Sequence, residues 1–156
     1  MKKTFLLISA LLCSSSAFAN LEIVDVKANS HDKAHVAKNV LDSSKKTRWA
    51  NKGESWIQFE FAGEQKLSKL DLSVFKGDER KASFNLEVSS DGQNWQKVFE
   101  AVSSGTTRDY ERYNFAPVTA KFARINGFGT DVSQSWTAFY DIRFQSDDSA
   151  AVEFTK

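Results

Sequence analysis

The segment Asn39–Trp49 (NVLDSSKKTRW) gathers residue types that can hold a hard metal ion. It combines the Asp42 carboxylate, the Thr47 hydroxyl and backbone carbonyls in one short stretch. Calcium takes about six to eight oxygen ligands of these kinds, and Asp141, far along the chain, is a candidate for a further carboxylate. The alternative is that Asp42 and Thr47 only cap a turn, as such side chains often do. We favour the calcium site.

Catalytic signatures are missing from the sequence. The single cysteine, Cys13, lies in the N-terminal apolar run, and there is no nucleophile elbow, zinc-protease helix or phosphate-cradling glycine loop. Carboxylate pairs such as Asp78 with Glu79, or Asp109 with Glu111, lie in polar loops without the apolar surroundings that raise the pKa of a catalytic acid. The sequence therefore predicts a binding protein that is not an enzyme.

The candidate metal-binding residues must be positioned mainly by β-strands. Period-two alternation is clearest in Ser55–Phe61 (SWIQFEF), and clusters of Gly, Asn, Asp and Ser separate the segments. The pattern predicts an all-β sandwich, with one helical turn at Val36–Leu41. The expected strands are Leu21–Lys27, Ser55–Phe61, Leu67–Phe75, Ser83–Ser89, Gln96–Val102, Glu111–Phe115, Lys121–Gly127 and Trp136–Phe144.

The N-terminus has the features of a secretory signal peptide. Met1-Lys2-Lys3 precedes the apolar run Phe5–Cys13, and Ala17-Phe18-Ala19 forms an A-x-A cleavage site. We expect cleavage after Ala19 and a secreted or periplasmic protein; a lipoprotein anchored at Cys13 is the alternative. The expected organisation is a signal peptide (1–19), one domain (20–145) and a C-terminal tail (146–156).

The net charge of the whole chain is +1, and loss of Lys2 and Lys3 brings it to −1. A nearly neutral domain has no strong field to attract nucleic acid or an anionic membrane. Without cysteines, the exported domain would depend on its hydrophobic core, with or without a metal, and not on disulfides.

Four segments together resemble the discoidin, or coagulation factor V/VIII type C, domain, and most closely the family 32 carbohydrate-binding modules. They are Asn39–Trp49, Ser55–Phe59, Glu87–Trp95 and Ala123–Ile125. The resemblance spans Val26–Phe144 and implies an eight-stranded antiparallel jelly-roll β-sandwich (galactose-binding-like) with a structural Ca2+. The implied ligands are the carbonyls of Asn39, Ser44 and Tyr140 and oxygens of Asp42, Thr47 and Asp141. Relatives often carry Asp or Asn in place of Ser44, which implies either a weaker site here or a site in which the Ser44 carbonyl alone serves.

The resemblance also implies that a sugar binds among loops at one end of the sandwich. An aromatic ring can cover the apolar face of a sugar, and arginine offers a fixed fork of donors for carboxylate or sulfate groups. For Arg80 the alternative is a solvated turn with Asp78 and Glu79, and for Trp136 it is a place in the core. The candidate ligand-binding residues are Lys76, Arg80, Arg108, Tyr110, Trp136 and His35.

The sequence thus predicts a secreted, non-catalytic domain that binds polysaccharide or cell-surface glycan, with acidic sugars among the candidates. Two alternatives stay open. One is a protein- or membrane-adhesion module, for which Phe128 between two glycines is the candidate apolar contact. The other is an accessory subunit of a separate polysaccharide-degrading enzyme.

Overall fold

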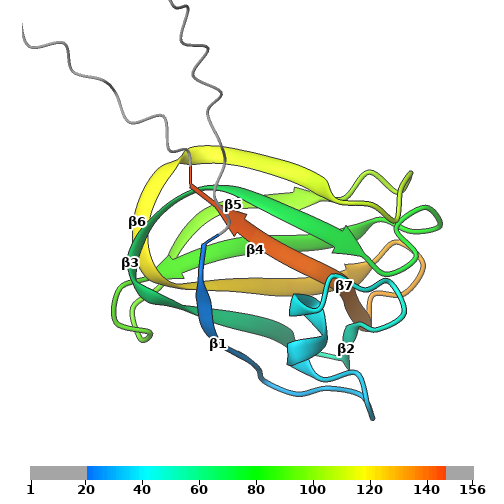
Figure 1. The fold of residues 1–156 in the computed structure, drawn as a ribbon. Helices are drawn as coiled ribbons and strands as arrows, with labels where there is room; N and C mark the ends of the chain where they lie inside the picture. The colour runs from blue at the N-terminus through cyan, green and yellow to red at the C-terminus, as the bar shows by residue number, and fades with distance from the viewer. Residues whose placement is uncertain (1–20, 147–156) are drawn as a thin grey trace, which may run out of the picture.

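The computed structural model describes residues 21–146 of the chain. This range contains seven β-strands and one short 3-10 helix, joined by loops (Figure 1). The predicted signal peptide and nearly all of the predicted tail lie outside the described residues. The elements are β1 (Ile23–Ala28), η1 (Ala37–Leu41), β2 (Trp49–Lys52), β3 (Ser55–Val74), β4 (Ala82–Ser89), β5 (Gln96–Val102), β6 (Glu111–Thr130) and β7 (Trp136–Gln145).

The strands pair in the order β2-β7-β3-β6-β4-β5, with β1 added beside β3, and every pairing is antiparallel. Figure 1 shows β3 and β6 curving together around one end of the molecule, so that each contributes to both layers of a sandwich. Register shifts between Glu60 and Gln65 and between Leu67 and Lys69 mark this bend in β3, as bulges do in strongly curved sheets. The predicted all-β, galactose-binding-like sandwich is confirmed.

Two of the expected strand breaks do not exist, which reduces the eight expected strands to six, and the additional strand β2 brings the observed count to seven. Segments 55–61 and 67–75 belong mainly to the single strand β3, and segments 111–115 and 121–127 both belong to β6. The residues between them, 62–66 in β3 and 116–120 in β6, continue the strand over the end of the sandwich without a chain reversal. The short strand β2 went unpredicted, because four residues with no alternation carry no clear period.

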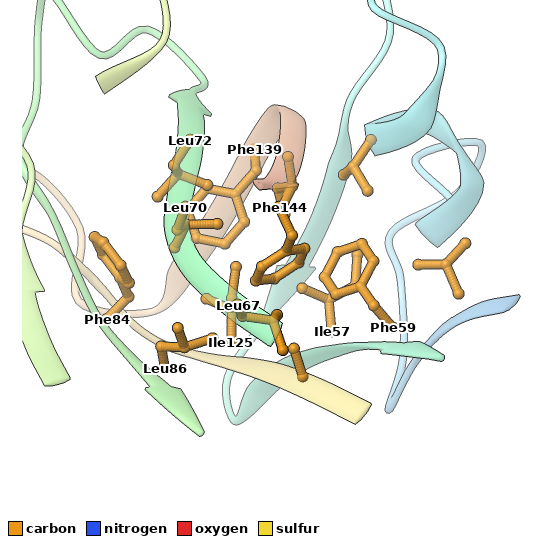
Figure 2. Close-up of a cluster of buried hydrophobic side chains, with 14 of the residues drawn as sticks. Ile57, Phe59, Leu67, Leu70, Leu72, Phe84, Leu86, Ile125, Phe139 and Phe144 are labelled. Carbon is orange, nitrogen blue, oxygen red and sulfur yellow. The ribbon is translucent and has the colours of Figure 1, made fainter. Parts of the chain in front are cut away.

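Alternate residues of the strands fill the space between the layers. Phe144 lies edge-on to Phe59 and Phe61, with ring centroids 5.2 and 5.5 Å apart, and all three are almost fully buried. Figure 2 shows Phe59 and Phe144 together with Leu70 and Leu72 of β3 and Phe84 of β4. Because side chains occupy the interior, a ligand must bind at the ends or on the outer faces.

The expected helical turn is confirmed as the 3-10 helix η1, whose Val40 is buried in the core. It leads directly into the loop predicted to hold a metal. Among residues 21–146, no helix has the length and apolar character needed to cross a membrane.

Candidate functional site

A cavity of about 250 Å³ lies at one end of the sandwich, where β3 and β6 end and β7 begins. The loop before η1, the residue before β2 and the connection from β3 to β4 close its sides. Ends of antiparallel strands and their loops therefore build it, as is common for ligand sites on a rigid scaffold. Its walls are formed by Asp32, His35, Arg48, Ala50, Phe75, Arg80, Thr130, Trp136 and Ala138.

Two arginines flank the Phe75 ring in this cavity. The guanidinium carbon of Arg48 lies 4.1 Å from the ring centroid, and that of Arg80 lies 5.5 Å from it. The Nε atom of each arginine is buried and has no hydrogen-bond partner among residues 21–146. A buried donor without an acceptor costs free energy, so the cavity offers an unused hydrogen-bonding capacity that an anionic group would satisfy.

His35 brings a titratable ring to the same cavity. Its backbone is fixed, because its N–H donates to the Asp32 carbonyl (2.9 Å) and its carbonyl accepts from the Ala50 N–H (3.2 Å). Partial burial lowers the pKa of His35 from its ordinary value of 6.5, and the Arg48 cation acts in the same direction. The imidazole is therefore mainly neutral near pH 7 in the free protein.

Trp136 is partly exposed and lines the cavity at the start of β7. Of the six residues proposed from the sequence to bind a ligand, the structure brings together His35, Arg80 and Trp136. Sequence reasoning missed Arg48 and Phe75. Arg48 was visible within the Thr47-Arg48-Trp49 motif, but Phe75 has the pattern of a strand residue that points into the core.

The other three candidates lie outside the cavity wall. Lys76 pairs with Glu79 at 3.5 Å. Arg108 donates from Nε to Asp78 Oδ1 (2.6 Å) and from Nη2 to Glu79 Oε1 (2.7 Å). It thus ties its own loop to the 76–81 loop that carries Arg80.

Tyr110, the third of these candidates, lies beside Asp141 and the bend around Asp42 that is predicted to hold a metal. Its hydroxyl donates to Asp141 Oδ2 (2.6 Å), and the guanidinium of Arg143 lies 4.2 Å from the centre of its ring. Tyr110 therefore positions the late carboxylate and does not face the cavity.

The residues proposed for calcium form a tight bend next to β7. Asp42 accepts the Ser44 N–H at 2.9 Å through Oδ1 and the Thr47 hydroxyl through Oδ2. Ser43 has a φ of 58°, a left-handed conformation that makes the bend possible. The turn capped by Asp42 and Thr47, which was the alternative to a metal site, is therefore present. The same side chains are those that a cation at this bend would use.

Asp141 approaches this bend from β7. It is 4% exposed, and its Oδ1 accepts the Ile142 N–H at 2.8 Å. Burial raises the pKa of Asp141, and the negative charge of Asp42 acts in the same direction, so the two carboxylates lie in each other's field. Arg143 lies beside them, with Nη2 3.0 Å from Ser43 Oγ and 3.9 Å from Asp141 Oδ2.

The backbone at Tyr140 also fits a ligand role. The register with β3 pairs Asp141 with Ser73 and Phe139 with Val74, so Tyr140 is skipped and bulges out of the ladder. Asn39 uses its side-chain amide to donate to the carbonyls of Arg48 (2.8 Å) and Ala34 (3.1 Å). Its amide nitrogen is therefore occupied, and oxygen atoms are what it has to offer.

This donor set consists of oxygen atoms, as calcium requires. Within residues 21–146 no three His, Cys, Asp or Glu side chains cluster as a metal site. A cation at this bend would thus depend on two carboxylates, one hydroxyl and backbone carbonyls. The residues fit calcium better than zinc, which prefers nitrogen and sulfur ligands.

Comparisons with known proteins agree with this architecture. The F5/8 type C domain model matches residues 25–142. The chain is similar to the CBM32 of AlyQ in complex with 4,5-unsaturated mannuronic acid, at 29% identity and a TM-score of 0.77, covering 81% of this chain and 97% of that one. It is also similar to a pectin-binding carbohydrate-binding module, at 40% identity and a TM-score of 0.76, covering 85% and 94%.

A third similar structure is a truncated AlyQ that contains CBM32 and alginate lyase domains. It is 28% identical with a TM-score of 0.80, covering 85% of this chain and 34% of that one. A sequence search of curated proteins gave no match.

The fold and these matches define the class of protein as a non-catalytic carbohydrate-binding module with a galactose-binding-like sandwich. The chain belongs to the F5/8 type C domain family.

Proposed function

We propose that this module recognises acidic sugars, with the carboxylate of a uronate bound between Arg48 and Arg80. The observation that carries the proposal is the pair of guanidinium groups close to the Phe75 ring that have no carboxylate partner among residues 21–146. Hydrogen bonds to an ionised acceptor are stronger than neutral ones. A uronate carboxylate would satisfy both donors and balance the positive charge of the cavity.

The remaining wall of the cavity suits a sugar ring. Phe75 and Trp136 offer apolar surface for the C–H face, and Asp32 and His35 offer polar groups for hydroxyls. Two similar structures support an acidic ligand, because one holds an unsaturated mannuronic acid and the other is described as binding pectin, a uronate-rich polysaccharide.

We also propose that the bend beside β7 holds a structural calcium ion. The carbonyls of Asn39, Ser44 and Tyr140 with oxygens of Asp42, Thr47 and Asp141 would supply its ligands. Calcium, when bound, supplies positive charge that favours the ionised form of the buried Asp141. The bulge at Tyr140 and the mutual field of Asp42 and Asp141 support this assignment.

The module would act outside the cytoplasm, because the N-terminal sequence has the pattern of a cleaved export signal. An accessory role beside a polysaccharide-degrading enzyme is the second candidate. It is favoured by the similar structure in which a CBM32 accompanies an alginate lyase domain.

Calorimetric titration with oligogalacturonate tests the acidic-sugar proposal. We expect Arg80→Ala to weaken binding about 10- to 100-fold, the loss typical of one charge-assisted hydrogen bond. Lys81→Ala is the matched control, since it removes the same charge from the neighbouring exposed residue outside the cavity wall. Equal affinities of the two variants, or a preference for a neutral galactan over oligogalacturonate, would contradict the proposal.

A further inference from the structure

A second surface with the chemistry of a sugar site lies on the outer face of β3, β6 and β4. The neighbouring residues Ile57, Ile125 and Leu86 point into the core, so the alternate residues of the same strands share the opposite face. The antiparallel register sets these side chains in two adjacent rows across the three strands: Trp56, Asn126 and Asn85, then Gln58, Arg124 and Glu87.

Arg124 lies against two indole rings on this face. Its guanidinium carbon lies 4.5 Å from the Trp56 ring and 4.0 Å from the ring of Trp95, which follows the turn after β4. Its Nη2 donates to Gln58 Oε1 at 2.9 Å. Its Nε is buried and has no hydrogen-bond partner in the described part of the chain.

The amides of this face are fixed but only partly used. Asn126 Nδ2 donates to Asn85 Oδ1 at 2.7 Å, and Gln58 accepts from Arg124. The remaining amide atoms, which are Asn126 Oδ1, Asn85 Nδ2 and Gln58 Nε2, make no hydrogen bond to another residue of the range 21–146. A planar donor and acceptor set held in place beside aromatic rings is what pairs of sugar hydroxyls require.

The charges of the face balance, unlike those of the cavity. Burial lowers the pKa of Arg124, while the nearby Glu87 carboxylate favours its charged form. Farther along the same strands, Glu60 pairs with Lys121 at 3.1 Å. Since no net charge remains to attract a uronate, the chemistry of this face suits an uncharged sugar.

Phe128 extends the same face toward the end of β6. It lies two residues beyond Asn126 in the same alternation, and it is 56% exposed. Phe128 thus adds an exposed aromatic ring in line with the fixed polar groups. The face therefore continues over several residues of β6 and is long enough to contact a chain segment.

We propose that this outer face is a second glycan-binding site, specific for a segment of uncharged polysaccharide. Trp95 and Phe128 contact the C–H faces of the sugar rings, and the partly exposed amide of Asn126, which is held by the buried Asn85, pairs with hydroxyls. The site is independent of the cavity and of the acidic-sugar proposal.

Affinity electrophoresis in gels that contain β-1,4-galactan, galactomannan or xyloglucan tests this site. The Arg80→Ala background weakens binding in the cavity, so retention is measured with the contribution of the cavity reduced. We expect at least one of the neutral polysaccharides to retain this protein, and both Trp95→Ala and Asn126→Ala to weaken the retention about tenfold, as loss of a main binding residue does. Gln96→Ala, an exposed neighbour of Trp95, is the control that should change nothing.

Several outcomes would overturn the second site. They are the absence of retention on all three neutral gels, loss of retention through Arg80→Ala alone, or retention that both face variants leave unchanged. Thermal melts establish whether the variants fold. If Trp95→Ala does not fold, Asn126→Ala still tests the site. A failure of oligogalacturonate binding would refute the cavity proposal and leave this one standing.

Discussion

At the scale of single residues, the cavity is defined by two arginines that the protein itself leaves unsatisfied. Arg48 and Arg80 lie on the Phe75 ring, which fixes their position without using their donors. Arg108, by contrast, spends its donors on Asp78 and Glu79. The same residue type thus plays two roles, and the difference lies in whether a carboxylate of the chain already neutralises it.

We predict that His35 makes the proposed binding of an acidic sugar pH-dependent. The pKa of His35 is lowered in the free protein, so its imidazole is neutral near pH 7. A bound carboxylate favours the protonated ring, and binding therefore takes up a proton. The affinity for oligogalacturonate should rise about three- to tenfold as the pH falls from about 8 to about 5, where a uronate carboxylate is still largely ionised.

Calorimetry at several pH values checks this prediction. His35→Gln keeps a polar side chain of similar reach but cannot titrate, so its affinity should stay flat over the same range. Identical pH profiles for the wild type and His35→Gln would show that the imidazole takes no part in binding.

At the scale of elements, the loop between β3 and β4 decides where Arg80 lies. Its backbone turns through Gly77 and Glu79, whose N–H groups donate to the carbonyls of Val74 (3.0 Å) and Lys76 (2.8 Å). Gly77 is buried, and a Cβ there would overlap the Thr107 carbonyl oxygen and lie 3.1 Å from the Val74 carbonyl oxygen. Both obstacles are backbone atoms, so the position leaves no room for a side chain.

Gly77→Ala should therefore displace this loop and move Arg80 out of place. We expect a stability loss of about 1–3 kcal/mol, as for other overpacked sites, together with weaker oligogalacturonate binding. Urea denaturation and calorimetric titration measure the two effects. Asp78→Ala changes an exposed side chain of the same loop without crowding its backbone, so it should lower stability much less. Wild-type affinity in Gly77→Ala would mean that the loop tolerates the extra atom without moving Arg80.

At the scale of the whole molecule, the proposed calcium site joins an early bend to a late strand. Asp42 follows η1, and Asp141 lies in β7, close to the end of the described residues. A cation between them would fasten segments about 100 residues apart. Because an ion that binds only the folded state stabilises it, a hundredfold excess over Kd would contribute about 2.7 kcal/mol.

Removal of calcium should consequently lower the melting temperature by roughly 10 °C, given the usual response of domains of this size. Scanning calorimetry with EDTA and with excess calcium measures the shift. Asp42→Asn should abolish the difference, whereas Asp109→Asn, at an exposed residue paired with Lys45, should preserve it. Equal melting temperatures in EDTA and calcium would refute the metal assignment.

The sequence by itself determined the β-sandwich and the bend around Asp42, because both depend on local information. Alternation in segments such as Ser55–Phe61 sets the faces of a strand, and the residues around Asp42 set a turn over a few positions. It also placed Arg80 and Trp136 in loops that meet at one end.

Only the tertiary structure decided which polar residues remain available to a ligand. Whether a polar side chain is free or paired depends on carboxylates that approach from distant segments. Asp78 and Glu79 approach Arg108 in this way, and Asp141 approaches Tyr110. The bend that merges two predicted strands into β3, and the register that places Trp56 and Asn85 beside Asn126, are likewise long-range pairings. No local pattern encodes them, since they arise from contacts between segments that are far apart in the chain.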